Sequence, residues 1–186
     1  MMLTTLYSLF VDSLRRLAAA EHQIARSLPR ILEGVSSQEL KSVVEEYLKE
    51  TEAHCERFEA IGAAMGEQLT GERAHIAEAF LREAILCVER RGEDRVIDLA
   101  AMSILRELVH YEKSAYEIVR SIAEVIGESR VVELIDSILN ETERTERAFI
   151  LLTEDMMDSM SVAREKGRMP PPESLLSSRP VERRGH

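Results

Sequence analysis

The sequence predicts an all-α protein in which two helical hairpins pair into a four-helix bundle. Apolar residues recur at alternating steps of three and four along four long segments, which is the pattern of helices packed in a bundle. Glycine (8) and proline (5) are scarce among the 186 residues, as is typical of helical rather than sheet proteins. The stretch Leu48–Glu52 also returns in similar form as Leu139–Glu143, so the chain carries an internal repeat long enough for a helix, a turn and a helix.

Composition and charge narrow the class of protein. A chain of 186 residues of which 45% are hydrophobic is long enough to form one sizeable buried core. The formal net charge of −10, without a basic stripe, argues against nucleic acid as a partner. Cys55 and Cys87 lack the close spacing of a metal or redox motif, so we expect reduced thiols in a cytoplasmic protein. No signal peptide and no apolar run long enough to cross a membrane are recognisable.

The first hairpin is expected within about residues 3–66. Glu21 occupies a position of the apolar seam in the middle of its first helix, where a buried carboxylate without a partner or a cation is costly. Gly34 is expected to end this helix. The seam of the second helix also turns polar in mid-helix, at Glu50 and His54, which are four residues apart and share one face.

The segment 72–91 has no counterpart in the second half of the chain, so we predict an extra helix in the crossover between the hairpins, lying along or across the bundle. Its apolar stripe is weaker than those of the other helices. The residues predicted to form the stripe are Ile76, Phe80, Ala84, Leu86 and Val88.

The second hairpin repeats the pattern of the first. Its first helix is expected at about 95–126, with Glu112 interrupting the seam and Gly127 in the turn. The seam of the last helix turns polar at Glu141 and Thr145. From Ser161 the pattern is lost, so we assign residues 1–161 to the bundle and residues 162–186, rich in proline, serine and arginine, to a flexible tail.

Four glutamates are expected to meet at the centre of the bundle. Glu50 and Glu141 are 91 positions apart, and Glu21 and Glu112 are separated by the same interval. With a helical rise of about 1.5 Å per residue, all four lie at nearly the same distance along the bundle from the turn of their hairpin. Four ionised carboxylates in one core layer repel each other unless cations lie between them. Since oxygen ligands suit iron and manganese, we predict a di-iron carboxylate site, with manganese as the alternative metal.

A nitrogen ligand is predicted less directly. Di-iron proteins of this type carry a histidine three residues after the glutamate on two of their helices, where this chain has Ala53 and Arg144. His54 follows Glu50 by four residues, shares its helix face and is therefore a candidate ligand. A hydrogen-bonded core histidine is an equally open interpretation of His54.

The second half-site is incomplete in the sequence. Thr145 stands at the position equivalent to His54 and is a poor metal ligand. Glu143 and Glu146 have a suitable mutual spacing but lie off the seam by one or two residues. The pattern leaves open which of these three residues completes the site, and favours one well-liganded ion and one weaker one.

The simpler alternative is a helical bundle whose acids are paired with arginines or solvated, because a single helical glutamate is usually a surface residue. Four glutamates at matched heights, each replacing an apolar residue, favour metal binding instead. Tyr7 and Tyr47 lie on the seams and are candidates to hydrogen-bond the carboxylates. Tyr111 and Tyr116 are interpreted as packing residues.

Four short segments also carry a resemblance to a known family. In their order and spacing they resemble the YciF-like family of ferritin-like bacterial stress proteins, over about residues 6–156. The resemblance implies a ferritin-like four-helix bundle with one extra helix, a di-metal site, a homodimer and a role in stress responses. The segments are Ala20-Glu21-His22-Gln23, Glu50-Thr51 with His54 and Glu56-Arg57, His110-Tyr111-Glu112, and Glu141 to Glu146.

Carried over by position, the family's carboxylates correspond to Glu21, Glu50, Glu112 and Glu141. The chain departs from the family at Val109, where a glutamate is frequent, and this removes a possible ligand. It also has Glu146 where the family usually has an aspartate.

Two main hypotheses of function follow. In the first, the protein is a cytoplasmic iron or manganese carboxylate protein with ferroxidase- or peroxidase-type activity on Fe²⁺ and O₂ or on peroxide. Glu50 and Glu141 would bridge two ions, Glu21 and Glu112 would be terminal ligands, and His54 a nitrogen ligand. In the second, the protein is a non-catalytic helical dimerisation or scaffold protein with a vestigial acidic cluster. A ferritin-type storage shell is a third and less favoured option.

Overall fold

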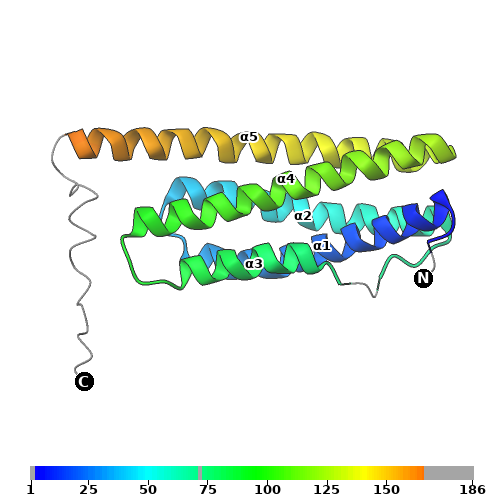
Figure 1. The fold of residues 1–186 in the computed structure, drawn as a ribbon, viewed down its shortest axis with the longest axis horizontal. Helices are drawn as coiled ribbons and strands as arrows, with labels where there is room; N and C mark the ends of the chain where they lie inside the picture. Colours follow the sequence, from blue (N-terminus) through cyan, green and yellow to red (C-terminus); the bar gives the residue numbers. More distant parts are fainter. Residues whose placement is uncertain (1–2, 71–72, 166–186) are drawn as a thin grey trace, which may run out of the picture.

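Five helices make up the chain in a computed structural model that describes residues 3–70 and 73–165. They lie along one long axis, and no strand occurs within these two ranges (Figure 1). The predicted all-α bundle of two hairpins with an extra helix in the crossover is confirmed. The helices are α1 (Leu6–Gly34), α2 (Gln38–Met65), α3 (His75–Val88), α4 (Asp94–Ile126) and α5 (Ser129–Glu165).

Local sequence signals determine the helix ends. Thr5 caps α1 by accepting a hydrogen bond from the Ser8 amide, and Ser37 caps α2 by accepting one from the Leu40 amide. Gly66 and Gly127 end α2 and α4 in the left-handed backbone conformation, which glycine adopts without strain. The first hairpin turns after Gly34 and the second at Gly127, as the sequence predicts.

A buried aspartate attaches the turn of the first hairpin to the second hairpin. Asp98 on α4 accepts hydrogen bonds from the backbone amides of Ser36 (3.0 Å) and Ser37 (2.7 Å), in the connection between α1 and α2. These contacts satisfy amide groups that the start of a helix would otherwise leave unpaired. They fix the height of one hairpin relative to the other, and so the level at which the mid-helix side chains meet.

The crossover helix α3 lies along the bundle beside α1 (Figure 1) and also contacts α4. Its predicted stripe was partly correct: Ala84 is buried and Phe80 and Val88 pack against the core, but Ile76 and Leu86 are exposed. Small residues allow this face to approach α1 and α4 closely, which a search for large apolar residues does not detect. The buried residues of α3 are Ala77, Leu81, Ala84 and Cys87.

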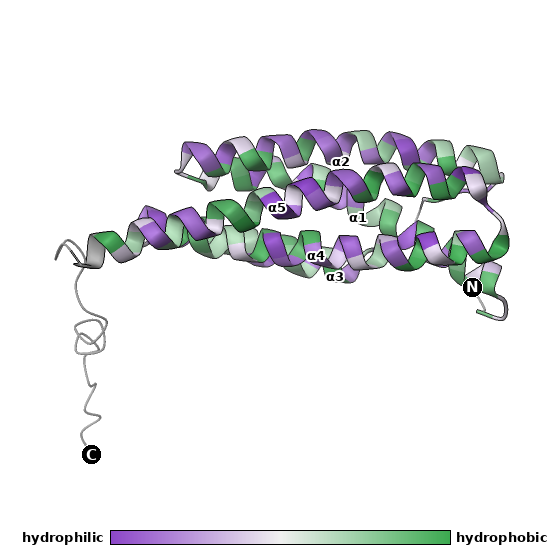
Figure 2. Cartoon of the chain, turned by 90° about the horizontal axis from the view of Figure 1, so that it is seen from above, coloured by the Kyte–Doolittle hydropathy of each residue, from purple (hydrophilic) through white to green (hydrophobic). Residues whose placement is uncertain are grey.

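The last helix is longer than expected. Helix α5 continues to Glu165, into the segment predicted as a flexible tail, and its final turns extend past the ends of the other helices (Figures 1 and 2). The rest of that predicted tail, 166–186, lies outside the described residues. Hydrophilic residues predominate on the face of α2 seen in Figure 2. None of the helices in the described ranges combines the length and apolar character that crossing a membrane requires.

The hydrophobic core is divided into two clusters. One contains Ile24, Leu28 and Leu105 with their neighbours, and the other contains Phe10 and Leu14 with theirs. Between the two, in the middle of the bundle, lies a layer of buried polar side chains. Its most buried members are Glu21, Thr51, His54, Glu112, Thr142 and Thr145.

The close contact of α1 with α3 at Gly34 gives a test of this packing. A Cβ atom added to Gly34 would lie 2.6 Å from the Cβ of Val88, so Gly34→Ala is expected to lower the free energy of unfolding by about 1–3 kcal/mol. The control is Gly92→Ala, whose Cβ would meet Ile97 at an ordinary 3.6 Å and is expected to change stability by less than about 0.5 kcal/mol. Urea denaturation measures both, and equal stabilities would contradict the packing of α3.

Candidate metal centre

Two glutamates lie close to each other in the buried centre of the bundle. Glu21 on α1 has 0% and Glu112 on α4 has 2% of its surface exposed. Burial raises the pKa of Glu112 well above its usual range, and the nearby charge of Glu21 raises it further, although a hydrogen bond from Tyr47 opposes the shift. Without a metal ion, Glu112 therefore retains a proton to higher pH than an ordinary glutamate.

A tyrosine from another helix holds each of these carboxylates. The Tyr116 hydroxyl on α4 donates a hydrogen bond to Glu21 Oε1, and the Tyr47 hydroxyl on α2 donates one to Glu112 Oε2. Burial and the adjacent carboxylates raise the pKa of both tyrosines well above the usual value, so both hydroxyls stay protonated and act as donors. Each glutamate is thus fixed through one oxygen. Glu21 Oε2 has no hydrogen-bond partner among the described residues.

His54 connects the buried pair to the opposite side of the bundle. Its Nδ1 lies 3.3 Å from Glu21 Oε2, an ion-pair distance without the alignment of a hydrogen bond, and its Nε2 lies 3.0 Å from Glu141 Oε2. Burial acts to lower the pKa of His54, but Glu21 and Glu141 outweigh it and raise this pKa. When Nε2 carries the proton, it donates a hydrogen bond to Glu141, and the lone pair of Nδ1 points towards Glu21.

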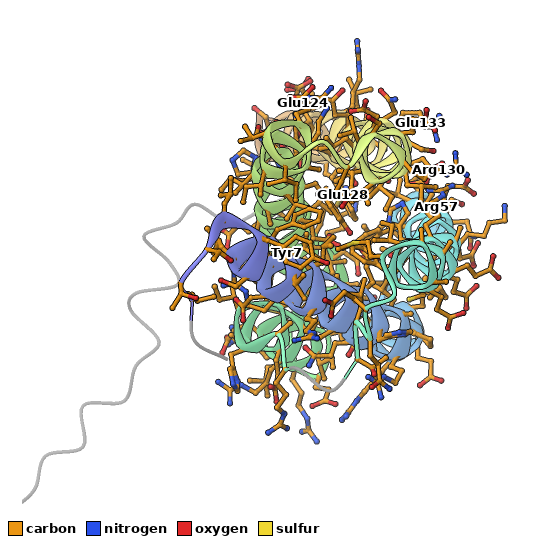
Figure 3. The ribbon with its side chains drawn as sticks, turned by 90° about the vertical axis from the view of Figure 1, so that its right-hand side faces the viewer. Tyr7, Arg57, Glu124, Glu128, Arg130 and Glu133 are labelled. Atoms are coloured by element: carbon orange, nitrogen blue, oxygen red, sulfur yellow. The ribbon has the colours of Figure 1, made fainter. Side chains whose placement is uncertain are left out.

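Glu141 is held by an arginine as well as by His54. Arg57 on α2 donates two hydrogen bonds to the carboxylate, from Nη2 to Oε1 at 2.9 Å and from Nη1 to Oε2. Figure 3 labels Arg57 beside α2, on the side towards α5. Partial burial acts to raise the pKa of Glu141, but the Arg57 guanidinium and His54 outweigh it and lower this pKa. Glu141 is therefore an ionised carboxylate at the edge of the polar layer.

Glu50 lies on the same edge but has its own partners. Thr145 on α5 donates a hydrogen bond to Glu50 Oε2, and Arg144 donates one to Oε1 at 3.4 Å. Glu50 is also near enough for its charge to contribute to the raised pKa of Arg57. The two glutamates on α2 and α5 thus lie next to a guanidinium, whereas those on α1 and α4 do not.

The other acids considered for the second half-site lie away from the centre. Glu146 pairs with His110 Nδ1 (2.8 Å) and Lys113 Nζ (3.2 Å) on α4, and Glu143 pairs with Lys113 Nζ at 3.3 Å. Of Glu143, Thr145 and Glu146, Thr145 reaches the polar layer. Its hydroxyl donates a hydrogen bond to Glu50 and is therefore not free to bind a metal ion. The second half of the repeat therefore offers no equivalent of His54.

The donor set suits one cation better than two. As the side chains are placed in residues 3–70 and 73–165, no three histidine, cysteine, aspartate or glutamate residues already converge as a metal site. Two buried ligand atoms, Glu21 Oε2 and His54 Nδ1, nevertheless lie close together without hydrogen-bond partners, and Glu112 is near enough to interact with Glu21. Two carboxylates and an imidazole are donors that iron and manganese accept.

The glutamates predicted from the sequence lie in or beside the polar layer. The structure brings Glu21, His54, Glu112 and Glu141 together, and Tyr47 hydrogen-bonds a carboxylate as predicted. Periodicity alone was enough to find these positions, because each of them interrupts an apolar seam.

Several partners of the glutamates were not predicted. Tyr116, interpreted as a packing residue, hydrogen-bonds Glu21. Tyr7, a candidate partner of the carboxylates, instead contacts Glu67 at 3.4 Å, in the connection after α2. Arg57 had no assigned role and binds Glu141. Each of these contacts joins segments far apart in the sequence, so helical spacing gives no signal for them. Val109, at the position where the family frequently has a glutamate, is buried in the core.

The internal repeat preserves the acids but not their partners. Positions 91 residues further on from Tyr47, His54 and Arg57 are occupied by Ile138, Thr145 and Ala148. The position equivalent to Tyr116 in the first half is Ala25. The site is therefore asymmetric, although the glutamates that form its centre are related by the repeat.

Comparison with known proteins gives consistent matches. The family described as "Domain of unknown function (DUF892)" matches residues 5–161. Protein YciF of Escherichia coli K12 is 24% identical over 147 residues, which cover 78% of this chain and 89% of YciF.

Solved structures show the same fold. The crystal structure of the E. coli stress protein YciF has a TM-score of 0.81 at 22% identity and covers 84% of this chain and 99% of its own. YcfI of Rhodopseudomonas palustris, a protein proposed to be structural, has a TM-score of 0.75 at 24% identity and covers 78% of this chain and 93% of its own.

The buried glutamate pair gives the metal-free protein a specific pH dependence. Because the pKa values of Glu112 and His54 are raised in the folded state, that state binds more protons than the unfolded one, and stability falls as the pH rises through the folded pKa values. Glu112→Gln removes the larger part of this dependence. Relative to wild type, the variant should gain stability as the pH rises above the ordinary range of a glutamate and until the raised pKa is passed, by up to about 1.4 kcal/mol for each pH unit.

Denaturation of chelator-treated protein at several pH values measures this difference. Glu117→Gln, an exposed position on the same helix, is the matched control and should leave the pH dependence unchanged. Parallel pH profiles for wild type and Glu112→Gln would show that Glu112 is not protonated in the fold.

Proposed function

We propose that this chain, which belongs to the DUF892 family as its resemblance to YciF-like proteins predicted, is a metal-binding carboxylate protein that holds iron or manganese. The observation that carries the proposal is the pair of buried atoms Glu21 Oε2 and His54 Nδ1. They lie 3.3 Å apart, without hydrogen-bond partners, beside a second buried glutamate. Buried polar atoms normally have partners, and a cation is the partner that suits these two.

Glu21, Glu112 and His54 would hold the ion. Tyr116 and Tyr47 fix one oxygen of each carboxylate, so little side-chain freedom is left to lose on binding. Glu141 accepts the hydrogen bond from His54 Nε2 and so directs Nδ1 towards the ion, as carboxylates do for metal-binding histidines. Metal binding would displace the protons of Glu112 and His54, so affinity should increase with pH.

The ion would supply electron exchange with O₂ or peroxide, in an oxidation of Fe²⁺ or a removal of peroxide. The surrounding apolar clusters keep bulk water from the site, and the protonated tyrosines donate hydrogen bonds beside it. A role in stress responses is proposed from the E. coli relative, which is described as a stress protein. The cytoplasmic location and the homodimer remain predictions.

Metal analysis tests the proposal. Protein purified without chelators and dialysed against Fe²⁺ or Mn²⁺ should retain about one ion per chain. Glu21→Ala and His54→Ala should each lose most of it, since even the loss of a ligand's hydrogen-bond partner reduces metal affinity by about 10–100-fold. Glu146→Gln, an acid outside the centre, is the control and should bind like wild type. Retention of less than about 0.3 ions per chain by wild type would remove the proposal.

The second candidate function is a non-catalytic helical scaffold. The Arg57–Glu141 pair favours it, because an arginine already neutralises one carboxylate of the layer. On this hypothesis Glu21→Leu raises the melting temperature in every buffer, since a core residue replaces a buried acid. On the metal hypothesis Mn²⁺ raises the melting temperature of wild type but not of Glu21→Leu. Thermal denaturation with Mn²⁺ and with chelator separates the two.

A further inference from the structure

The carboxylates on the Glu50–Glu141 side of the polar layer lie next to a positively charged side chain, Arg57. Arg57 donates hydrogen bonds to both oxygens of Glu141, and Oε2 of the same carboxylate also contacts His54. Both oxygens through which Glu141 would bind a metal ion are therefore engaged. The planar guanidinium matches the carboxylate in a two-point contact that an ammonium group cannot reproduce.

Arg57 is set into the protein rather than extended into solvent. A quarter of its side chain is exposed, and Glu141 and Glu50 beside it are 17% and 12% exposed. Such partial burial reduces solvent screening, so the guanidinium would repel a second ion near Glu50 and Glu141. By contrast, the Arg144 side chain is 69% exposed and reaches Glu50 only at 3.4 Å.

We propose that Arg57 takes the place of a second metal ion between Glu141 and Glu50, and so makes this a one-ion rather than a two-ion carboxylate site. The inference rests on the proposed function and specifies its stoichiometry. It assigns Glu141 as a positioning residue for His54, held by Arg57, and not as a bridging ligand. The repeat agrees with this assignment, because Ala148 occupies the position equivalent to Arg57 and supplies no second guanidinium.

The test counts bound ions. Chelator-treated wild type is dialysed against Mn²⁺ and analysed for manganese per chain, and electron paramagnetic resonance distinguishes isolated from paired Mn²⁺ ions. Wild type should bind one isolated ion. Arg57→Gln, which removes the charge and frees Glu141, should bind two ions with the signal of a coupled pair.

Two further variants test whether a positive charge at position 57, rather than one elsewhere on this edge, excludes the second ion. Arg57→Lys keeps a positive charge in place and should still bind one ion. Arg144→Gln removes the exposed guanidinium on the same edge and should also bind one ion. Circular dichroism checks folding, and Arg57→Met replaces Arg57→Gln if the latter does not fold.

Several results would overturn the inference. Two ions in wild type would contradict it without any variant. One ion in both wild type and folded Arg57→Gln would contradict it while leaving the proposed metal site intact, and so would two ions in Arg144→Gln. No ion in wild type would instead remove the proposed function itself, whereas one ion in wild type and none in folded Arg57→Gln would contradict the inference alone.

Discussion

Two carboxylates buried against each other in an apolar bundle impose the constraint on which the other features of this protein depend. Glu21 and Glu112 cannot both be ionised at low cost in such surroundings, so a proton or a cation must be shared between them. Two tyrosines hydrogen-bond the pair, and His54 is oriented towards it. The two apolar clusters of the core lie on either side of it. The stability of the fold and the chemistry of its centre are therefore coupled.

The sequence predicted the bundle well because helical periodicity is a local signal. Most helix bounds, the crossover helix and the mid-helix level of the glutamates follow from spacing and from capping residues such as Ser37 and Gly127, whereas the end of α5 does not. What spacing does not determine is which side chains meet across helices. Tyr116 donates to Glu21 over 95 positions, and Arg57 reaches Glu141 over 84, so neither contact leaves a periodic trace in the chain. The stripe of α3 was partly misplaced for a related reason, because the most buried positions of its contact face are mainly small residues.

Arginine and metal ions are alternative solutions to the same electrostatic problem. A carboxylate at the edge of a polar layer can be neutralised by a bound ion, which depends on supply from the cell, or by a side chain, which is always present. This chain has Arg57 on one side of the layer and two buried atoms without hydrogen-bond partners on the other. On our proposal, this difference between the two sides, rather than the number of acids, sets how many ions the site takes.

The asymmetry of the internal repeat also bears on how such a centre arises. A symmetric pair of first hairpins would place two copies of His54 and Arg57 around its acids but no tyrosine at the position of Tyr116. A pair of second hairpins would have that tyrosine twice, but neither the imidazole nor the guanidinium. Neither self-paired ancestor would contain the present constellation. If the halves descend from one hairpin, specialisation became possible only after fusion into a single polypeptide, when each copy was free to diverge.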